Sequence, residues 1–310
     1  MESYLRSSLW KPDIAIDLGT AMTRISSGTR NLFVVPSIVR GHPVLRSGII
    51  KDCSSVVELL QPLLFKVRKF GIVRPNVVVC VPSDASAVEL DAFRECIFKA
   101  GASTVFIVPE PLAAAIGAGM DVASPYAGMI VDIGEGATDC AIIRSGKIIS
   151  KSTLRVGCFD LRQLLIKAVY SENKIRICEN EAERIVRAVG VSRTALSDVQ
   201  TTLYGWSERA GSAKSASIPV AEIQEQIEAI IRLIVDVAHC LLQDLSPAIG
   251  CEIIENGIFL SGGGALLPGM RERLESRTNI PVILPPKPLE AVVTGAREML
   301  PIVALLNKRM

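Results

Sequence analysis

Two similar stretches decide the fold of this chain: Ile16-Asp17-Leu18-Gly19-Thr20 and Val131-Asp132-Ile133-Gly134-Glu135-Gly136. In each stretch an aspartate and glycines directly follow an apolar run, which is typical of a buried strand that ends in a turn. Glycine has no Cβ, so backbone N–H groups in such a turn can approach a phosphate closely. Two such turns that face each other would hold a polyphosphate from both sides. The predicted phosphate-binding residues are Gly19, Thr20 and Ala21 in the first turn and Gly134, Glu135 and Gly136 in the second.

The two aspartates fit a magnesium site. In proteins Mg²⁺ usually keeps several waters and is held by one or two carboxylates together with phosphate oxygens. We therefore expect Asp17 and Asp132 to hold a hydrated Mg²⁺ through water. The alternative is that each aspartate forms a helix N-cap or a turn, as aspartates before glycine commonly do. The presence of both in matched motifs favours the metal.

Two further motifs follow a fixed order along the chain. In Val108-Pro109-Glu110-Pro111-Leu112, an acid precedes a proline, which suits the first turn of a helix. Glu110 would then lie at a strand-to-helix junction beside the phosphates. Later, a predicted strand runs into a triple-glycine turn where the backbone could approach a flat ring or a ribose. The glycines of this turn are Gly262, Gly263 and Gly264.

In these motifs the sequence resembles the actin, sugar kinase and heat-shock chaperone ATPases, and most closely the bacterial actin homologue MreB. The resemblance runs from Asp13 to about Arg297 and includes Arg155-Val156-Gly157. It implies an α/β, actin-like ATPase fold, in which two ribonuclease-H-like domains surround a nucleotide cleft. It also implies that ATP or ADP is bound with Mg²⁺.

The resemblance assigns roles to individual residues. Glu110 would orient the water that attacks the γ-phosphate, and Thr138 would lie close to that phosphate. Glu183, with Arg187, would lie at the nucleoside. Each residue has a simpler alternative: Glu110 could complement a helix N-terminus, Thr138 could bond to backbone, and Glu183 could form an ion pair with Arg187 four residues later.

Three differences from MreB stand out. Met22 replaces an asparagine in the first phosphate turn, and Glu135 adds an acid to the second, which should weaken polyphosphate binding unless Mg²⁺ offsets the repulsion. MreB also has a small outer subdomain between the segments 36–39 and 48–52, and here residues 40–47 alone remain. Because that subdomain contributes to filament contacts and shields the nucleotide, its loss puts both polymerisation and slow nucleotide exchange in question.

The domain prediction follows from these segments. Residues 1–12 form a tail or an amphipathic membrane anchor, 13–157 the first actin-like domain, and 158–310 the second, with an outer subdomain at about 173–217. Within it, the polar stretch Tyr204–Ser217 contains glycine and serine and is predicted to be a loop.

Composition is consistent with a packed protein but does not identify it. The chain has 310 residues, of which 49% are hydrophobic, and a net charge of +2. The net charge is close to neutral, and the sequence shows no clustered basic residues of the kind that nucleic-acid binding requires. We found no apolar run near the roughly 20 residues that would span a bilayer. The eight cysteines include no Cys-x-x-Cys and are predicted to be reduced core residues of a cytosolic protein.

Two segments favour contact with a membrane surface. Met1, Tyr4, Leu5, Leu9 and Trp10 have helical spacing, as in an interfacial anchor, although a frayed tail is the alternative. The apolar tip Phe70-Gly71-Ile72-Val73 is flanked by basic residues, which suits an anionic inner leaflet. These basic residues are Lys66, Arg68, Lys69 and Arg74.

We therefore expect an MreB-like cytoskeletal protein that binds ATP and Mg²⁺, forms filaments with itself, and acts in cell shape or wall synthesis. Slow ATP hydrolysis is expected, as is a cytoplasmic location, peripheral to the inner face of the membrane, with morphogenesis membrane proteins as further partners. The alternative is a nucleotide-binding adaptor that no longer polymerises alone and co-assembles with a full-length MreB homologue. A small-molecule kinase has less support, because kinases of this fold normally carry large insertions.

Overall fold

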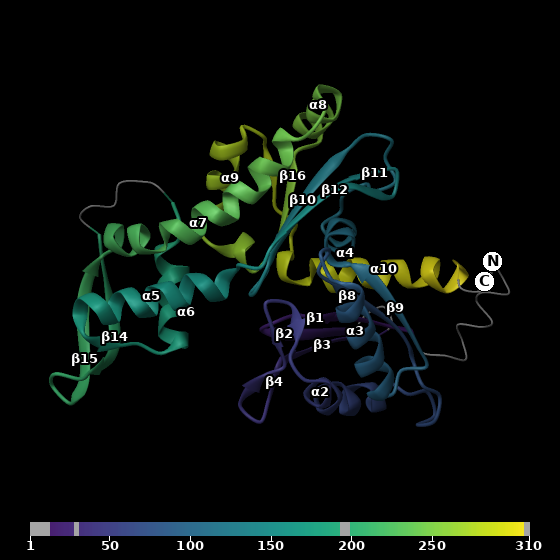
Figure 1. The fold of residues 1–310 in the computed structure, drawn as a ribbon, viewed down its shortest axis with the longest axis horizontal. Coiled ribbons are helices and arrows are strands. Elements are labelled where there is room, and N and C mark those ends of the chain that lie inside the picture. Colours follow the sequence, from purple (N-terminus) through teal and green to yellow (C-terminus); the bar gives the residue numbers. More distant parts are fainter. Residues whose placement is uncertain (1–12, 28–30, 193–198, 307–310) are drawn as a thin grey trace.

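Two five-stranded mixed sheets form the centre of the molecule (Figure 1). The structure is a computed structural model that describes residues 13–27, 31–192 and 199–306. The strand order is β3-β2-β1-β8-β9 in the first sheet and β12-β11-β10-β16-β17 in the second. In each sheet three consecutive strands form an antiparallel meander. The other two strands continue the sheet in parallel, from β1 to β8 and β9 in the first sheet and from β10 to β16 and β17 in the second. The two sheets thus have the same topology, which confirms the predicted pair of similar α/β units.

Each of the two sheets has five strands in the part of the chain that the structure describes. In the first sheet they are β1 (Asp13–Leu18), β2 (Met22–Ser27), β3 (Asn31–Pro36), β8 (Asn76–Val81) and β9 (Thr104–Pro109). In the second they are β10 (Gly128–Ile133), β11 (Thr138–Arg144), β12 (Lys147–Leu154), β16 (Ile258–Gly262) and β17 (Val282–Ile283). The central strands β8 and β10 are buried along nearly their whole length, because helices cover both faces of their sheets.

Helices cover the outer face of each sheet. On the first sheet these are α2 (Cys53–Lys66) and α3 (Ala87–Lys99). On the second they are α7 (Val220–Gln243), α8 (Pro247–Asn256) and α9 (Met270–Thr278), while α5 (Cys158–Asn173) and α6 (Glu179–Val189) pack against α7 in the same apolar core. The short helices η1 (Gly264–Leu266) and η2 (Pro288–Glu290) contact β16. The 24-residue helix α7 buries Ile223, Ile227, Ile231 and Ile234, which share one face at helical spacing.

The inner faces of the two sheets are separated by two crossing helices, α4 (Glu110–Gly117) and α10 (Ala291–Leu306) (Figure 1). Side chains alternate between the faces of a strand, so Ile130 of β10 faces this layer whereas Val131 faces the outer helices. Helix α10 packs on β1 and β8, and α4 packs on β10 and β11. A Cβ added at Gly117 would lie 1.8 Å from the carbonyl oxygen of Ala291, and one at Gly295 equally close to that of Ala113. Glycine at these two positions therefore permits the helices to touch through their backbones.

The structure moves the division between the units. The second sheet begins with β10 at residue 128, well before the predicted boundary at 157, so the meander β10-β11-β12 belongs with the later part of the chain. Between β3 and α2 the chain forms two small hairpins, from β4 (Ile38–Val39) with β5 (His42–Pro43) and from β6 (Leu45–Arg46) with β7 (Ile49–Ile50).

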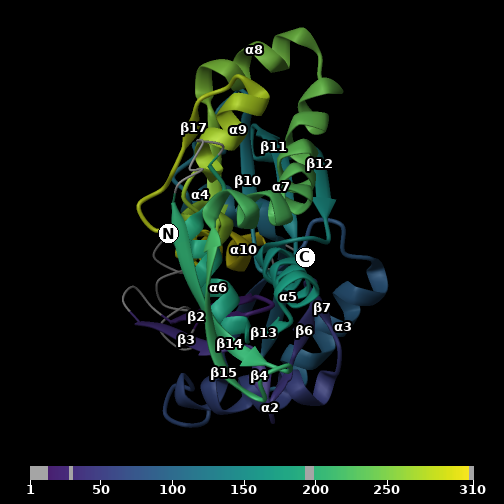
Figure 2. The same ribbon diagram turned by 90° about the vertical axis from the view of Figure 1, so that its left-hand side faces the viewer.

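The prediction of a loop at Tyr204–Ser217 was wrong. This segment is most of an antiparallel hairpin, β14 (Gln200–Ser207) with β15 (Ser212–Pro219), and β13 (Ile175–Arg176) pairs with β14. Leu203 and Ser207 are buried, whereas the residues on the other face are exposed, so the strand needs few apolar side chains. Figures 1 and 2 show this small sheet beside α5 and α6.

The prediction that all cysteines are reduced was also wrong. A disulfide joins Cys53, at the start of α2, to Cys96 in α3, with a Cα–Cα distance of 5.2 Å. The two helices pack side by side on the first sheet, so cysteines 43 positions apart in the sequence meet. Spacing alone could not reveal this pairing. The other cysteines are free. Cys80 and Cys140 are buried in the strands, as predicted, but Cys178, Cys240 and Cys251 are exposed, so they are not core residues.

Candidate functional site

Asp17 lies near the end of β1, in the middle of the first sheet, with 5% of its surface exposed. The strand register places Arg24 of β2 directly opposite, and Arg24 NH1 lies 3.4 Å from Asp17 Oδ2. Burial raises the pKa of Asp17, and the charge of Arg24 opposes this rise. Asp17 is thus a buried carboxyl with one weak cationic partner.

Asp132 occupies the equivalent place in the second sheet, near the end of β10. Ser261 of β16 donates a hydrogen bond to its Oδ1 over 2.5 Å. The residue opposite on the antiparallel neighbour, where the first sheet has Arg24, is here a second acid, Asp139. Burial raises the pKa of Asp132 to about 7; the Ser261 bond opposes this rise and Asp139 adds to it.

The two glycine turns that follow these aspartates touch each other. A Cβ at Gly136 would lie 2.8 Å from Thr20 Oγ1 and 2.8 Å from the Cα of Ser47. Thr20 Oγ1 also accepts a hydrogen bond from the Gly48 N–H over 3.1 Å. In the second turn, the Gly134 N–H donates to the Ala137 carbonyl. The structure therefore brings both predicted phosphate turns together, with β6-β7 against them.

Glu110 is the first residue of α4, directly after β9, at the predicted strand-to-helix junction. Its pKa lies well above its usual range, first because of burial and then because Asp139, Asp17 and Asp132 are close; Arg155 opposes the rise. Asp139 itself accepts hydrogen bonds from Ser83 and Thr153. Three carboxyl groups from the two sheets and one from the start of α4 thus form one acidic centre.

A family model for MreB/Mbl proteins matches residues 35–308. The chain belongs to the MreB/Mbl family. The cell shape-determining protein MreB of Escherichia coli (strain K12) is 30% identical over 326 aligned positions, which cover 94% of this chain and 94% of that protein. Since 326 exceeds the 310 residues of this chain, the alignment includes positions at which that relative has residues and this chain has none.

Solved structures agree with the family. MreB5 of Spiroplasma citri bound to ADP superposes with a TM-score of 0.88 at 25% identity, covering 97% of this chain and 99% of that chain. A MamK double helical filament shares the fold, with a TM-score of 0.77 at 19% identity over 93% of this chain and 98% of that chain. The prediction of an actin-like fold of the MreB type is confirmed.

Two of the predicted site residues, Thr138 and Glu135, bond to other residues of this MreB/Mbl family member. Thr138 is fully buried and its hydroxyl donates to the Val156 carbonyl over 2.9 Å, so it can act on a ligand only as an acceptor. Glu135 forms an ion pair with Arg162 of α5, with a 3.1 Å hydrogen bond from NH1 to Oε2. Arg162 therefore balances the additional acid of the second turn.

The remaining predicted residues are those expected to lie beside the nucleoside. Glu183 and Arg187 form an exposed ion pair of 2.7 Å within α6, the alternative considered above. Of the three turn glycines, Gly262 and Gly264 are explained by packing, because a Cβ at either would lie within about 2.3 Å of Ile133. A Cβ at Gly263 would meet nothing closer than 3.9 Å. Gly263 is thus the member of the three that leaves room for a ligand.

Sequence reasoning missed the partners of the predicted residues. Arg24 could have been found by pairing β1 with β2 as a hairpin, since this register sets it opposite Asp17. Asp139 directly follows the predicted Thr138 and could have been found the same way. Arg162 and Arg155 could not, because their partners lie 27 and 71 positions away in the sequence.

Other features of the described residues bear on the remaining predictions. No three His, Cys, Asp or Glu side chains there are grouped so as to chelate a metal directly. Nor does any helix of that part have the length and apolar character needed to cross a bilayer. Phe70 and Ile72 are 76% and 81% exposed, and the predicted anchor Met1–Trp10 lies outside the described residues.

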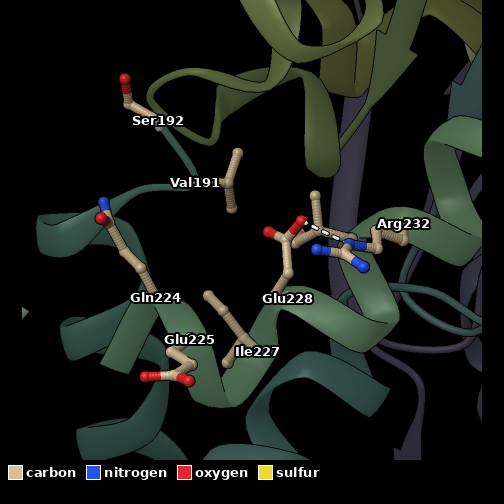
Figure 3. Close-up of a pocket in the computed structure, with 8 residues that line it drawn as sticks. Val191, Ser192, Gln224, Glu225, Ile227, Glu228 and Arg232 are labelled. Atoms are coloured by element: carbon tan, nitrogen blue, oxygen red, sulfur yellow. Dashed lines mark hydrogen bonds and ion pairs between the residues drawn. The ribbon is translucent and has the colours of Figure 1, made fainter. Parts of the chain in front are cut away.

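A hollow of about 200 Å³ lies on α7 beside the segment that follows α6 (Figure 3). Glu228 and Arg232 of α7 border it and form an ion pair of 2.8 Å. None of the predicted nucleotide-site residues lines this hollow, so it is separate from the acidic centre.

Proposed function

We propose that this chain is an MreB-type cytoskeletal protein that binds ATP and ADP between its two sheets. The observation that carries the proposal is the pairing of the two halves: Asp17 and Asp132 lie near the ends of equivalent strands, and Thr20 of one turn lies against Gly136 of the other. Support also comes from MreB5 of Spiroplasma citri, which has the same fold over nearly its whole length and was solved with ADP.

The acidic centre favours a bound cation. Burial raises the pKa of Asp17, Asp132 and Glu110, and repulsion from neighbouring acids adds to the rise at Asp132 and Glu110. A hydrated Mg²⁺ held through water by Asp17 and Asp132 would relieve this repulsion and neutralise phosphate charge. Backbone N–H groups of the turns at Gly19–Ala21 and Gly134–Gly136 would bind the phosphates, and Glu183, Arg187 and Gly263 would lie on the nucleoside side.

Slow hydrolysis is the activity that this arrangement supports best. Glu110, with its raised pKa, would hold and orient a water for attack on the γ-phosphate. Thr138 would accept a hydrogen bond from that water, because its own proton is used on Val156.

In the cell, the protein would form filaments with itself or with an MreB homologue, at the inner face of the membrane, in cell shape or wall synthesis. The exposed tip Phe70–Val73, beside Lys69 and Arg74, supports membrane contact. A second candidate is an adaptor that binds nucleotide but needs a full-length homologue to polymerise. The shortness of the two hairpins between β3 and α2 supports it, because the resemblance to MreB predicts a larger outer subdomain in that segment.

Titration of the purified chain with a fluorescent ATP analogue, with and without Mg²⁺, tests nucleotide binding. Wild-type protein should bind more tightly with Mg²⁺, and Asp17→Asn should remove that difference, whereas Asp121→Asn, an exposed aspartate, should retain it. Absence of binding by the wild type would contradict the proposal.

Sedimentation at micromolar concentration with Mg²⁺-ATP separates the two candidates. Pelleting that depends on ATP identifies a filament former. Protein that binds nucleotide but pellets only when a full-length MreB homologue is added identifies the adaptor.

A further inference from the structure

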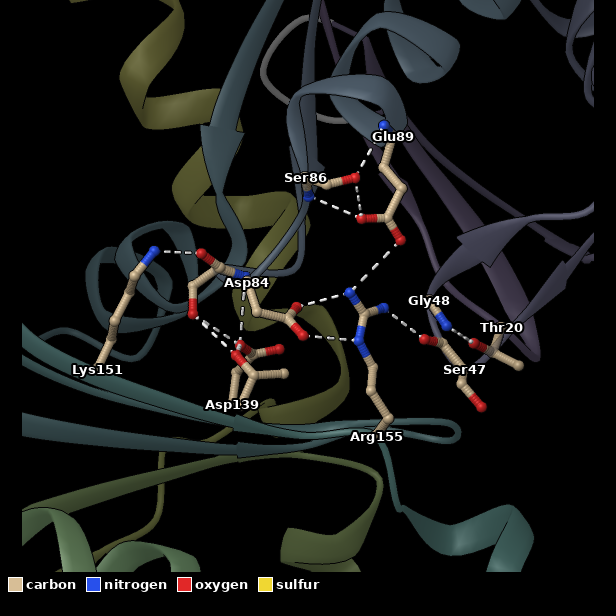
Figure 4. A network of polar contacts seen from close by, with 11 residues as sticks. Thr20, Ser47, Gly48, Asp84, Ser86, Glu89, Asp139, Lys151 and Arg155 are labelled. Atoms are coloured by element: carbon tan, nitrogen blue, oxygen red, sulfur yellow. Dashed lines mark hydrogen bonds and ion pairs between the residues drawn. The ribbon is translucent and has the colours of Figure 1, made fainter.

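Arg155, at the end of β12, extends from the second sheet to the first unit (Figure 4). Its Nε and NH2 donate to both carboxylate oxygens of Asp84 over 2.9 and 2.6 Å. Its NH1 donates to the carbonyl oxygen of Ser47 over 2.6 Å. One guanidinium thus bonds to two separate segments of the first unit, in the bidentate geometry that makes arginine–carboxylate pairs strong.

The Ser47 end of this contact leads to the first phosphate turn. Gly48, directly after Ser47, donates its N–H to Thr20 Oγ1 over 3.1 Å. Ser47 and Gly48 form the tight turn between β6 and β7, with positive φ of 50° and 76°. Movement of Arg155 would therefore act on Thr20 through one residue.

The backbone that follows Arg155 leads to the second phosphate turn. Cys158 and Phe159 donate their N–H groups to the carbonyls of Gly134 and Glu135 over 3.1 and 2.9 Å. Gly157 lies so close that a Cβ there would be 2.6 Å from the Gly134 carbonyl oxygen. Hydrogen bonds and a short piece of chain thus connect one phosphate turn to the other through the side chain of Arg155.

Other contacts near Arg155 also join the second sheet to the first unit. Lys151 of β12 donates to the Ser83 carbonyl, and Asp139 accepts from the Ser83 hydroxyl over 3.0 Å. Glu89 holds the start of α3 in a capping box and places Oε1 3.8 Å from Arg155 NH2. The charge of Arg155 also lowers the pKa of Glu110 against the effect of the surrounding acids.

We propose that Arg155 is a latch that holds the two units together across the nucleotide cleft, so that the cleft cannot open until its bonds to Asp84 and Ser47 break. This proposal rests on the proposed function, which is what gives the two turns their role in binding phosphate. Arg155 is a positioning residue, because it acts on the phosphate turns through Thr20 and Gly134 and contacts no substrate itself.

The test measures dissociation of a fluorescent ATP analogue from the full chain by stopped flow, for wild type, Arg155→Gln and Asp84→Asn. Arg155→Gln should release nucleotide about tenfold faster, and Asp84→Asn should have a smaller effect because the bond from Arg155 to Ser47 remains. The double variant should be no faster than Arg155→Gln, because that change already removes both bonds. Arg155→Lys should be intermediate, since lysine retains the charge but cannot bond in a bidentate fork.

Arg184→Gln is the matched control. Arg184 also donates through Nε and NH2 to one carboxylate, that of Glu181, and through NH2 to a carbonyl, that of Thr202, but all three residues lie within the second unit. This variant should change release less than twofold. Equal release from Arg155→Gln and Arg184→Gln would overturn the latch while leaving nucleotide binding intact.

Small-angle scattering without nucleotide gives an independent readout. Arg155→Gln should have a larger radius of gyration than wild type and Arg184→Gln, with an unchanged circular dichroism spectrum. If wild-type protein binds no nucleotide, the proposed function fails and scattering alone decides on the latch: an unchanged radius in Arg155→Gln would overturn it.

Discussion

At the scale of single residues, Asp132 should make the protein less stable as pH rises. Its pKa is 3.8 in an ordinary setting and about 7 when folded, so between these values the folded state keeps a proton that the unfolded state loses. The contribution to stability is therefore complete below about pH 4 and is lost as pH approaches 7. Asp132→Asn should raise the melting temperature of nucleotide-free protein at pH 8 by about 5 °C, and much less at pH 4.

Differential scanning calorimetry at the two pH values measures this effect. Asp121→Asn, at an exposed position, is the control and should leave both melting temperatures unchanged. A lower melting temperature of Asp132→Asn at pH 8 would show that the carboxylate stabilises the folded state, contrary to the effect of its burial.

Glu110 offers a second prediction at this scale. Glu110→Gln retains the size of the side chain but removes its ability to take a proton from water. Steady-state ATP turnover should fall by roughly 100-fold, whereas affinity for the nucleotide should change little. Phosphate release and analogue titration measure the two quantities separately. Glu95→Gln, on the exposed side of α3, is the control; equal turnover in both variants would remove Glu110 from the reaction.

At the scale of secondary-structure elements, the crossing of α4 and α10 depends on its glycines. Gly117→Ala places a methyl group 1.8 Å from a backbone oxygen, which cannot move without shifting a helix. We expect a loss of about 3 kcal/mol in the free energy of unfolding, measured by urea denaturation. Gly250→Ala, in α8, meets no atom within 4 Å and should be neutral or stabilising by up to about 1 kcal/mol.

The disulfide between α2 and α3 can be tested by counting thiols. Protein denatured without reductant should show the six free cysteines, and reduction should reveal all eight. Cys53→Ser should show seven thiols without reductant, because Cys96 loses its partner. Eight thiols in unreduced wild type would contradict the link.

Elements with a continuous apolar pattern could be predicted from the sequence. Strands β8 and β10 are continuous apolar runs, and helices α3 and α7 bury apolar residues at helical spacing, because burial on one or both faces leaves a regular pattern in the sequence. The hairpin β14-β15 could not be recognised in this way, since it buries few side chains and its sequence is mostly polar. The aspartates and glycine turns of the site were predictable as motifs, but the ion pairs between them depend on how distant elements pack.

At the scale of the whole molecule, the tip at Phe70–Val73 should determine contact with lipid. Its two most exposed apolar side chains stand beside Lys69 and Arg74, so both apolar and ionic attraction act at one place. Changing Phe70 and Ile72 together to serine should weaken binding to anionic vesicles by about tenfold in a flotation assay.

Phe98→Ser is the control for this prediction. Phe98 is also an exposed aromatic residue, at 54%, but it lies on α3. Vesicle binding should be unaffected by this change. Equal loss in the control and in the double variant would show that general surface hydrophobicity, and not the tip, drives the association.

The position of α10 affects how the protein is made. This helix, formed by residues 291–306, covers the inner side of β1 and β8, which leave the ribosome long before it. Apolar side chains such as Ala15 and Val78 therefore stay uncovered until α10 has been synthesised. Most multidomain proteins instead complete their N-terminal part first. Here the earliest sheet to be translated is among the last to be finished, which gives ribosome-associated chaperones a defined apolar surface to protect.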